Sequence, residues 1–341
     1  MQMEDQQPRV MRIAINGCGR IGGTIAKQLL IGDTPQLRLV AINDRASTQE
    51  LQEYLQRDSV YGLFALPIRT RSKSLIAGSS DVATFCEEDP RRLPWKKLRV
   101  DTVIESTGAF TTERSARAHL LAGAGRVIIT TTPHAGSVGY NVLGTDAVDT
   151  SGQVLSHGSC TTTAVTPVVS MIREQYTIKA WTLFAVQSVT HSQSVVDKSH
   201  GLERRRRQAL NNIVPISLDT DRAVPNLFTG SLANYAGQGV RVPTSIVHLS
   251  VITLLVKQRT SVAEFNAALK SLASRTPWRG VVRVSTEPLV SQDIRETTES
   301  AIIDTGMTKV AGEHLVQIGL WYDNEWGFAG RIIDLLSRIG R

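Results

Sequence analysis

The alternation of apolar and polar positions divides the chain into two parts of different character. The first part alternates short apolar runs with stretches that are apolar at helical spacing. The short runs are 12–15, 37–42, 102–105 and 126–130, and the helical stretches are 21–31 and one ending near residue 122. Strands that alternate with helices in this way predict an α/β domain with a doubly wound parallel sheet, over residues 11–158.

The pattern changes after Cys160. A helix is expected from about 162 to 175, and then longer β-rich runs follow at 181–189, 246–257, 282–284 and 315–321, with a helix at 262–273. This mixture predicts an α+β domain with a mixed or antiparallel sheet over 159–325. Residues 326–341 are amphipathic again and are expected to form a closing helix on the first domain.

Composition narrows the class of protein. The chain has 341 residues, of which 41% are hydrophobic, and this size favours two domains. It contains no apolar run of the roughly 20 residues that a membrane span needs, and its first ten residues are polar, so we expect a soluble cytoplasmic protein. Its three cysteines are widely scattered, which argues against disulfides and against a zinc site, so no metal is expected.

The net charge of +7 indicates attraction to anions. The only dense basic run is Arg204 to Arg207, within a polar stretch from 198 to 212. A solvated loop or a subunit-interface segment is favoured over nucleic-acid binding, since anionic small molecules account for the charge equally well.

A glycine motif lies between the first strand and the first helix. Gly17, Gly19 and Gly22 fit G-x-G-x-x-G, and Asp44 ends the next strand, 22 residues after Gly22. Glycines allow a tight turn, and the helix N-terminus offers N–H groups to a pyrophosphate, as in a Rossmann fold. The aspartate accepts ribose hydroxyls and repels a 2′-phosphate, so NAD is favoured over NADP. An ordinary strand-to-helix turn is the alternative.

Cys160 stands at a predicted loop-to-helix junction and is followed by two threonines. A thiol at a helix N-terminus has its pKa lowered by the helix dipole and is a better nucleophile. A buried, inert core cysteine explains the spacing equally well. Cys18 and Cys86 are expected to be structural.

Several motifs in the same order resemble the phosphorylating glyceraldehyde-3-phosphate dehydrogenase family, most closely its erythrose-4-phosphate dehydrogenase branch. The similarity runs from Ile13 to Leu336 and is carried by the segments 15–22, 105–108, 159–162, 241–244 and 322–327. Softer features point to the erythrose branch, namely the segments 93–95, 193–197 and 288–291 and the group His200, Arg204, Arg205 and Arg207.

This resemblance implies that the Cys160 thiolate attacks an aldehyde of a phosphorylated sugar, that NAD takes the hydride, and that water or phosphate releases the thioester. It also implies a homotetramer. The catalytic positions implied are Cys160 and Gln187, and the substrate-binding positions are Ser159, Thr161, Thr190, Arg205 and Arg241. The cofactor-binding positions implied are Gly17, Gly19, Arg20, Ile21, Gly22, Asp44, Thr107, Gly108, Thr130 and Asn324.

The chain departs from the family at the base. The family has a histidine 27 residues after the nucleophile, where this chain has Gln187, and an amide cannot accept a proton at neutral pH. His191 lies four residues further on, ~13 Å away along a strand. Thr163, the segment 217–220 and Glu88 depart as well. Two hypotheses stay open: a working dehydrogenase with altered or attenuated activity, and a cofactor-binding paralogue with a regulatory or interaction role.

Overall fold

The computed structural model describes residues 10–32, 34–133, 138–145, 151–201 and 203–339. Its contacts divide the chain into two compact units. One comprises Met1–Asn141, Asp149–Gly158 and Ala329–Arg341, and the other comprises Val142–Val148 and Ser159–Phe328. Gly144 (φ 80°) shows why the short piece belongs to the second unit, since a Cβ there would lie 2.6 Å from the ring of Trp278. The predicted domain bounds, 11–158 and 159–325, stay a prediction.

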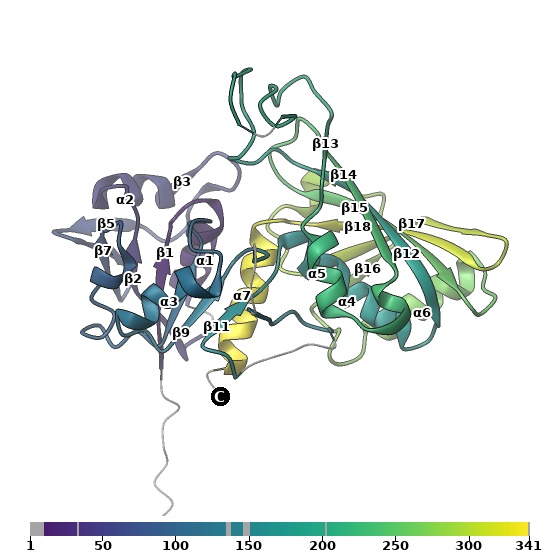
Figure 1. Ribbon diagram of the computed structural model, residues 1–341, viewed down its shortest axis with the longest axis horizontal. Helices are drawn as coiled ribbons and strands as arrows, with labels where there is room; N and C mark the ends of the chain where they lie inside the picture. The colour runs from purple at the N-terminus through teal and green to yellow at the C-terminus, as the bar shows by residue number, and fades with distance from the viewer. Residues whose placement is uncertain (1–9, 33, 134–137, 146–150, 202, 340–341) are drawn as a thin grey trace, which may run out of the picture. The chain divides into compact units, whose positions relative to one another are not determined.

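The first unit is built on a nine-stranded sheet with the order β10-β11-β9-β8-β1-β2-β7-β6-β5 (Figure 1). Neighbouring strands from β10 to β7 run parallel, and β6 and β5 add an antiparallel edge. The strands are β1 (Met11–Asn16), β2 (Leu37–Asn43), β5 (Ile68–Arg71), β6 (Ser74–Ala77), β7 (Ser80–Phe85), β8 (Thr102–Glu105), β9 (Arg126–Ile129), β10 (Gly139–Tyr140) and β11 (Val154–Ser156). A separate pair, β3 (Arg57–Asp58) and β4 (Gly62–Leu63), is antiparallel.

Four helices belong wholly or largely to this unit: α1 (Arg20–Ile31), α2 (Thr48–Gln56), α3 (Glu113–Leu121) and α7 (Trp326–Ile339), besides the short η1 (Pro90–Arg92). Helix α7 covers 326–339 of the expected closing segment 326–341, whose last two positions lie outside the described residues, and most of the helix falls in the first unit. Its buried residues Phe328, Ala329, Ile332, Leu335 and Leu336 recur at helical spacing, which gives the helix one apolar face.

The second unit is built on a seven-stranded mixed sheet with the order β13-β14-β12-β15-β18-β17-β16. The pairs β12·β14 and β16·β17 are parallel and the other pairs are antiparallel. The strands are β12 (Ile178–Gln187), β13 (Val214–Ile216), β14 (Tyr235–Arg241), β15 (His248–Val256), β16 (Val282–Ser285), β17 (Ala301–Ala311) and β18 (Leu315–Tyr322). Helices α4 (Cys160–Arg173), α5 (Thr220–Leu227) and α6 (Val262–Ala273) lie against one face of this sheet (Figure 1), and η2 (Gly230–Ala233) and η3 (Ser291–Ile294) are single short turns.

Two findings concern a membrane span and a metal site, neither of which the sequence predicts. No helix in the described part of the chain is long and apolar enough to cross a membrane. The described residues also contain no cluster of three or more histidine, cysteine or carboxylate side chains that could hold a metal ion.

Candidate active site

Cys160 is the first residue of α4, in the second unit. Ser159 is its N-cap, and the Ser159 Oγ accepts a hydrogen bond from the N–H of Thr162 at 3.2 Å. A serine in this place satisfies one of the free N–H groups at the helix start. The helix therefore begins two residues earlier than predicted, and the partly buried thiol stands on its first turn.

A chain of hydroxyl groups leads to the thiol. Thr161 Oγ1 accepts hydrogen bonds from Gln187 Nε2 and from the Tyr322 hydroxyl, each at 3.1 Å. Ser250 Oγ lies 3.1 Å from the same tyrosine oxygen. With two donors pointing at it, the Thr161 hydroxyl is left to donate towards the sulfur of Cys160, an interaction that favours the thiolate.

The pKa of Cys160 contradicts the expectation of an activated thiol. Burial raises it to about 11, although the hydroxyl and N–H of Thr161 and the charge of Arg241 act to lower it. Asp219 acts with burial, since its negative charge also disfavours a thiolate. The helix terminus therefore does not by itself activate this cysteine, because desolvation of the charged form is the larger effect.

Three of the predicted substrate-binding residues lie together as an anion-binding group. An Arg241 guanidinium N–H donates to Thr190 Oγ1, which is 3.1 Å from Ser192 Oγ, and Ser192 Oγ accepts from Arg205 at 3.3 Å. Burial, and then the charge of Arg205, lowers the pKa of Arg241 to about 10. Arg241 Nε is also buried without a hydrogen-bond partner among the described residues. Two cations held this close favour an anion between them.

Gln187 is the last residue of β12, paired in the sheet with Arg241 of β14. The strand ends there, so the prediction that His191 continues the same strand was wrong. His191 lies in a turn and is exposed.

Asn324 lies at the start of the segment after β18. Its Oδ1 accepts the N–H of Val247 at 3.0 Å. Val247 has a φ of 71°, a conformation that is costly for a β-branched residue. The asparagine therefore holds a strained residue in place immediately before β15.

In the first unit, the glycine turn forms a cradle that side chains would fill. A Cβ on Gly17 (φ 90°) would lie 2.7 Å from the Thr107 N, and a Cβ on Gly22 would collide with the Gly17 carbonyl. Gly19 is the N-cap of α1, has no side chain to cap the helix and has open space around it. A helix N-terminus without a side-chain cap, next to open space, suits a pyrophosphate, so these residues fit a dinucleotide.

Asp44 and Arg20 take different places beside this turn. The two oxygens of Asp44 accept the N–H of Cys18 at 2.6 Å and of Ala46 at 2.9 Å. Each oxygen keeps a further lone pair for a ribose hydroxyl. Arg20, next to Ile21 on the first turn of α1, makes an ion pair with Asp58 at 2.9 Å.

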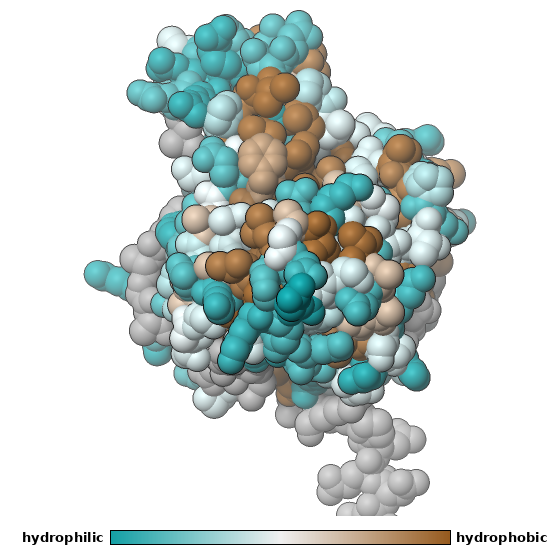
Figure 2. Space-filling view, turned by 90° about the vertical axis from the view of Figure 1, so that its right-hand side faces the viewer, coloured by the Kyte–Doolittle hydropathy of each residue, from teal (hydrophilic) through white to brown (hydrophobic). Residues whose placement is uncertain are grey.

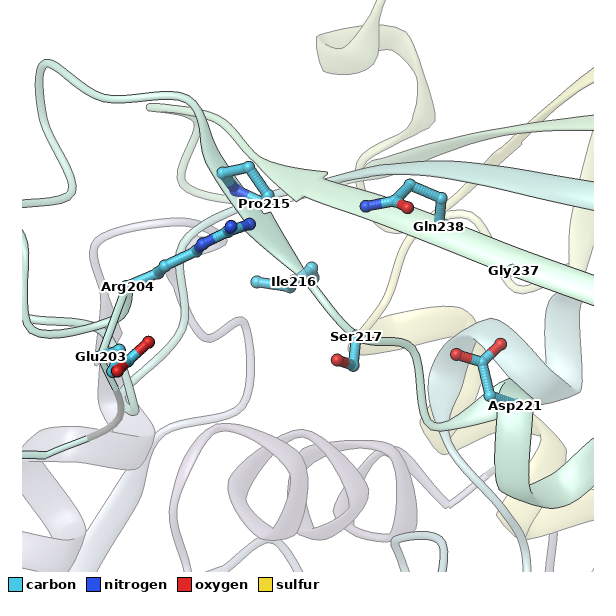
Figure 3. A pocket seen from close by; sticks show the side chains of 8 residues that line it. All are labelled: Glu203, Arg204, Pro215, Ile216, Ser217, Asp221, Gly237 and Gln238. Carbon is cyan, nitrogen blue, oxygen red and sulfur yellow. The ribbon is translucent and has the colours of Figure 1, made fainter.

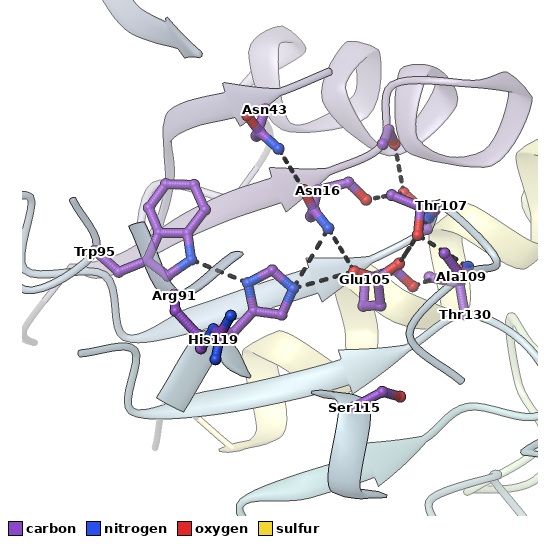
Figure 4. A network of polar contacts seen from close by, with 12 residues as sticks. Asn16, Asn43, Arg91, Trp95, Glu105, Thr107, Ala109, Ser115, His119 and Thr130 are labelled. Carbon is purple, nitrogen blue, oxygen red and sulfur yellow. Dashed lines mark hydrogen bonds and ion pairs between the residues drawn. The ribbon is translucent and has the colours of Figure 1, made fainter. Parts of the chain in front are cut away.

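A buried network fixes the end of β8 (Figure 4). Glu105 accepts from Asn16 Nδ2 at 2.6 Å, from the Thr107 N–H at 2.8 Å and from the Thr107 hydroxyl. His119 Nε2 is 3.1 Å from the same carboxylate, and the Trp95 indole donates to its Nδ1 at 3.1 Å. Thr130 donates to the Glu105 carbonyl at 3.2 Å. These bonds set the position of Thr107 and of Gly108 (φ 74°), two predicted cofactor residues.

A separate cavity of about 350 Å³ lies between β13, β14 and α5 (Figure 3). Glu203, Arg204, Ser217 and Asp221 are its charged and hydroxyl-bearing lining residues. None of the predicted catalytic or anion-binding residues lines it, so it is distinct from the group around Cys160.

His248 and the hydroxyl of Ser250 are not among the residues predicted from the sequence. Both lie on β15, on the face that carries the buried residues of that strand. The only signal was a histidine at the start of an otherwise apolar run, seven residues after Arg241.

Comparison with known proteins agrees with this geometry. Residues 11–113 match the family described as glyceraldehyde 3-phosphate dehydrogenase, NAD binding domain, and residues 159–324 match its C-terminal domain. The chain is 38% identical to glyceraldehyde-3-phosphate dehydrogenase of Thermotoga maritima over 328 residues, or 96% of this chain and 98% of that protein. The enzyme of Zymomonas mobilis is 34% identical over 334 residues, or 97% and 99%. The chain belongs to the glyceraldehyde-3-phosphate dehydrogenase family.

Family membership confirms the predicted combination of a Rossmann domain with a mixed-sheet domain, and it confirms NAD as the cofactor. The chloroplastic A subunit of Chlamydomonas reinhardtii, 34% identical over 95% of this chain and 87% of its own length, shows that the family spans bacteria and plastids. The chain is thus an NAD-dependent dehydrogenase of this family, whereas the erythrose-4-phosphate branch stays a prediction.

Proposed function

We propose that the chain oxidises the aldehyde of a phosphorylated sugar, erythrose 4-phosphate or glyceraldehyde 3-phosphate, through a covalent intermediate on Cys160. The observation that carries this proposal is the arrangement of the second unit. The thiol on the first turn of α4 lies close enough to the buried Arg241 for their charges to interact, and the partly exposed Arg205 stands beside Arg241 in the same unit. The thiol suits the aldehyde and the cation pair suits the phosphate.

The residues take the following roles in this proposal. The Cys160 sulfur adds to the aldehyde carbon, and the Cys160 N–H and the Gln187 amide stabilise the oxygen of the resulting thiohemiacetal. Thr190, Arg205 and Arg241 hold the phosphate. The chemistry that NAD supplies when bound is acceptance of a hydride. Gly17, Gly19, Gly22, Asp44 and Thr107 hold the cofactor in the first unit, and Asn324 orients its nicotinamide.

The acyl acceptor is proposed to be water. Asp219 lies close enough to raise the pKa of Cys160 and to act on the charge of Arg241. A carboxylate near the sulfur repels a phosphate dianion but not water, which favours hydrolysis of the thioester over phosphorolysis.

The test is a stopped-flow measurement of NADH at stoichiometric enzyme, with the two sugar phosphates compared side by side. A burst followed by slower turnover is expected, and Cys160→Ser abolishes both while NAD binding is retained. Turnover that is unchanged when inorganic phosphate is omitted supports water as the acceptor. No burst with either sugar phosphate would sink the dehydrogenase proposal.

A second candidate is a catalytically weak NAD-binding paralogue with a regulatory or interaction role. Two observations favour it: the amide at position 187 and the pKa of Cys160, which burial raises to about 11. It is supported if NAD binds tightly while neither sugar phosphate yields NADH over hours.

A homotetramer is proposed as the assembly. The sheet face away from the helices carries exposed apolar residues, among them Phe184, Leu255 and Leu315, with exposed fractions of 42%, 41% and 44%. Leu255 and Leu315 are cross-strand neighbours. Figure 2, which views the right-hand side of Figure 1, shows apolar residues gathered in a patch bordered by polar ones. Apolar patches of this kind mark association surfaces. A monomer mass by light scattering at micromolar concentration would refute this assembly.

A further inference from the structure

Four side chains form a row across the second sheet. Gln187 pairs with Arg241 in the parallel ladder of β12 and β14, and His248 pairs with Tyr322 in the antiparallel ladder of β15 and β18. The ladder of β12 and β15 ends at Val186 opposite Leu249, so its next pair places Gln187 opposite His248. Directly opposite residues share a face of the sheet, with Cβ atoms about 4.5–5.5 Å apart. The order of the row is therefore Arg241, Gln187, His248 and Tyr322.

The row lies beneath the first turn of α4. Both neighbours of His248, Gln187 on one side and Tyr322 on the other, donate to Thr161 Oγ1. Thr161 in turn bonds to the sulfur of Cys160. The imidazole of His248 therefore stands between Gln187 and Tyr322, the two residues that bond to Thr161.

His248 has no structural partner for its ring nitrogens. Its side chain is 2% exposed, and within the described ranges neither Nδ1 nor Nε2 has a hydrogen-bond partner. Its ring packs edge-on against Tyr322, with ring centroids 5.3 Å apart. Buried polar groups are ordinarily hydrogen-bonded, so an imidazole that stays unbonded in a polar cluster is available to a proton donor.

The ring is also held in place from behind. Val247, the preceding residue, has its strained φ of 71° fixed by the bond from its N–H to Asn324 Oδ1. Strain of this kind persists only where the surroundings enforce it, and it gathers at functional sites.

We propose that His248 is the base that serves Cys160 in this chain, and that it replaces the imidazole missing at position 187 from one strand away. The inference rests on the proposed function for the reaction that His248 assists. The transfer of a proton from Cys160 to His248 does not depend on that function. The proton leaves the Cys160 S–H, or the O–H of the thiohemiacetal, and is taken up by a His248 ring nitrogen through one intervening water. The electron pair stays on sulfur or forms the carbonyl of the thioester, and hydrolysis of the thioester returns the proton.

Charge at the anion-binding group acts on this base in addition to burial. Burial, and then the positive charge of Arg241, lowers the pKa of His248 to about 3, so the resting imidazole is neutral and the thiol protonated. The other titratable groups around it are the Tyr322 hydroxyl and, across Thr161, the Cys160 thiol, both kept neutral by burial. A phosphate group on Arg241 offsets the cation. This relieves the lowering of the His248 pKa that Arg241 causes, and it also withdraws the lowering that Arg241 exerts on the pKa of Cys160, so faster reaction of the thiol would come from proton uptake by His248. Substrate binding and proton uptake are coupled in this way.

The experiment measures alkylation of Cys160 by iodoacetamide, which needs neither aldehyde nor NAD. The intact chain with Cys86→Ser is used, because Cys86 is exposed and also alkylates. Rates are followed by peptide mass spectrometry from pH 5 to 11, with inorganic phosphate or with chloride at equal ionic strength. We expect phosphate to accelerate alkylation near pH 7 at least tenfold, and His248→Asn to remove that acceleration. The exposed His191→Asn is the matched control and is expected to behave as the unsubstituted chain.

A rescue variant separates the loss of a base from a structural defect. Replacing both residues, Gln187→His with His248→Ser, returns an imidazole to β12, and we expect it to recover the alkylation rate that His248→Asn loses. Equal rates for His248→Asn and wild type at every pH, with and without phosphate, would overturn the inference. An altered alkylation profile without any NADH burst would instead overturn the proposed function and leave the inference standing. If His248→Asn fails to fold, a phosphate-independent alkylation profile of the wild-type chain overturns the inference by itself.

Discussion

Gln187 donates its Nε2 to Thr161, so its amide acts here as a hydrogen-bond donor that orients a hydroxyl beside the thiol. A neutral histidine at this position could donate in the same way and could also accept a proton. Glutamine at this position therefore keeps the hydrogen-bond donor of a histidine but lacks its proton acceptor. This loss gives the substitution at position 187 a measurable kinetic consequence.

We expect Gln187→His to raise the rate of thioester formation. The gain is about tenfold in the wild-type chain, because His248 already serves as a base. In the His248→Asn background it is on the order of 10²-fold, the usual contribution of a general base. Single-turnover NADH formation in the four variants of this cycle measures both values. Equal gains in the two backgrounds would show that the two imidazoles do not share a role. If Gln187→His has no effect while His191→Ala abolishes activity, His191 is the base instead.

Asp44 gives a second prediction on single residues. Its carboxylate is fixed by the N–H groups of Cys18 and Ala46, so it cannot easily turn away from a 2′-phosphate. We expect NAD to bind at least about tenfold more tightly than NADP, because of the repulsion between the two anions. Calorimetric titration checks this, and Asp44→Ala should narrow the difference. Equal affinities in the wild-type chain would contradict it.

At the scale of elements, the helices whose caps and apolar spacing agree were the most predictable. Helix α6 begins and ends where predicted, since Ser261 and Glu264 form a capping box before a regular apolar stripe. Strands β13 and β14 were missed, because β13 is only three residues long and β14 contains two glycines and alternates weakly. The position of His248 could not be read from the sequence at all. It depends on the pairing of two strands whose facing residues are 61 positions apart.

The cap of α4 can be tested separately from the chemistry. Ser159→Ala removes the bond to the Thr162 N–H and is expected to lower the free energy of unfolding by about 1 kcal/mol. It should also slow alkylation of Cys160, because the first turn that carries the thiol is less well held. Ser261→Ala at the start of α6 is the matched control, with a similar loss of stability by urea unfolding and an unchanged alkylation rate. Slowing in both variants would trace the effect to general destabilisation.

At the scale of the whole molecule, each unit contains a buried histidine that is kept neutral. Burial is the main cause that lowers the pKa of His157 in the first unit and of His248 in the second, each from 6.5 to about 3. Between these two values the unfolded chain binds more protons than the folded chain. The stability associated with each histidine is therefore fully present above pH 6.5 and is lost as the pH falls towards 3.

We expect the unfolding temperature to fall as the pH is lowered from 7 to 4.5, and the fall to be smaller in His248→Asn than in wild type. Asp58 contributes little to the slope in this range. Burial acts to raise its pKa, but hydrogen bonds from Lys27, Val60 and Arg20 outweigh burial and lower the pKa to about 2. Its stability is lost only as the pH falls from about 3.8 towards 2. Calorimetry of both variants across this range, with His191→Asn as the exposed control, provides the measurement. A slope that is the same in all three proteins would mean that the pKa of His248 does not differ between the folded and unfolded chains, which would contradict its lowering by burial.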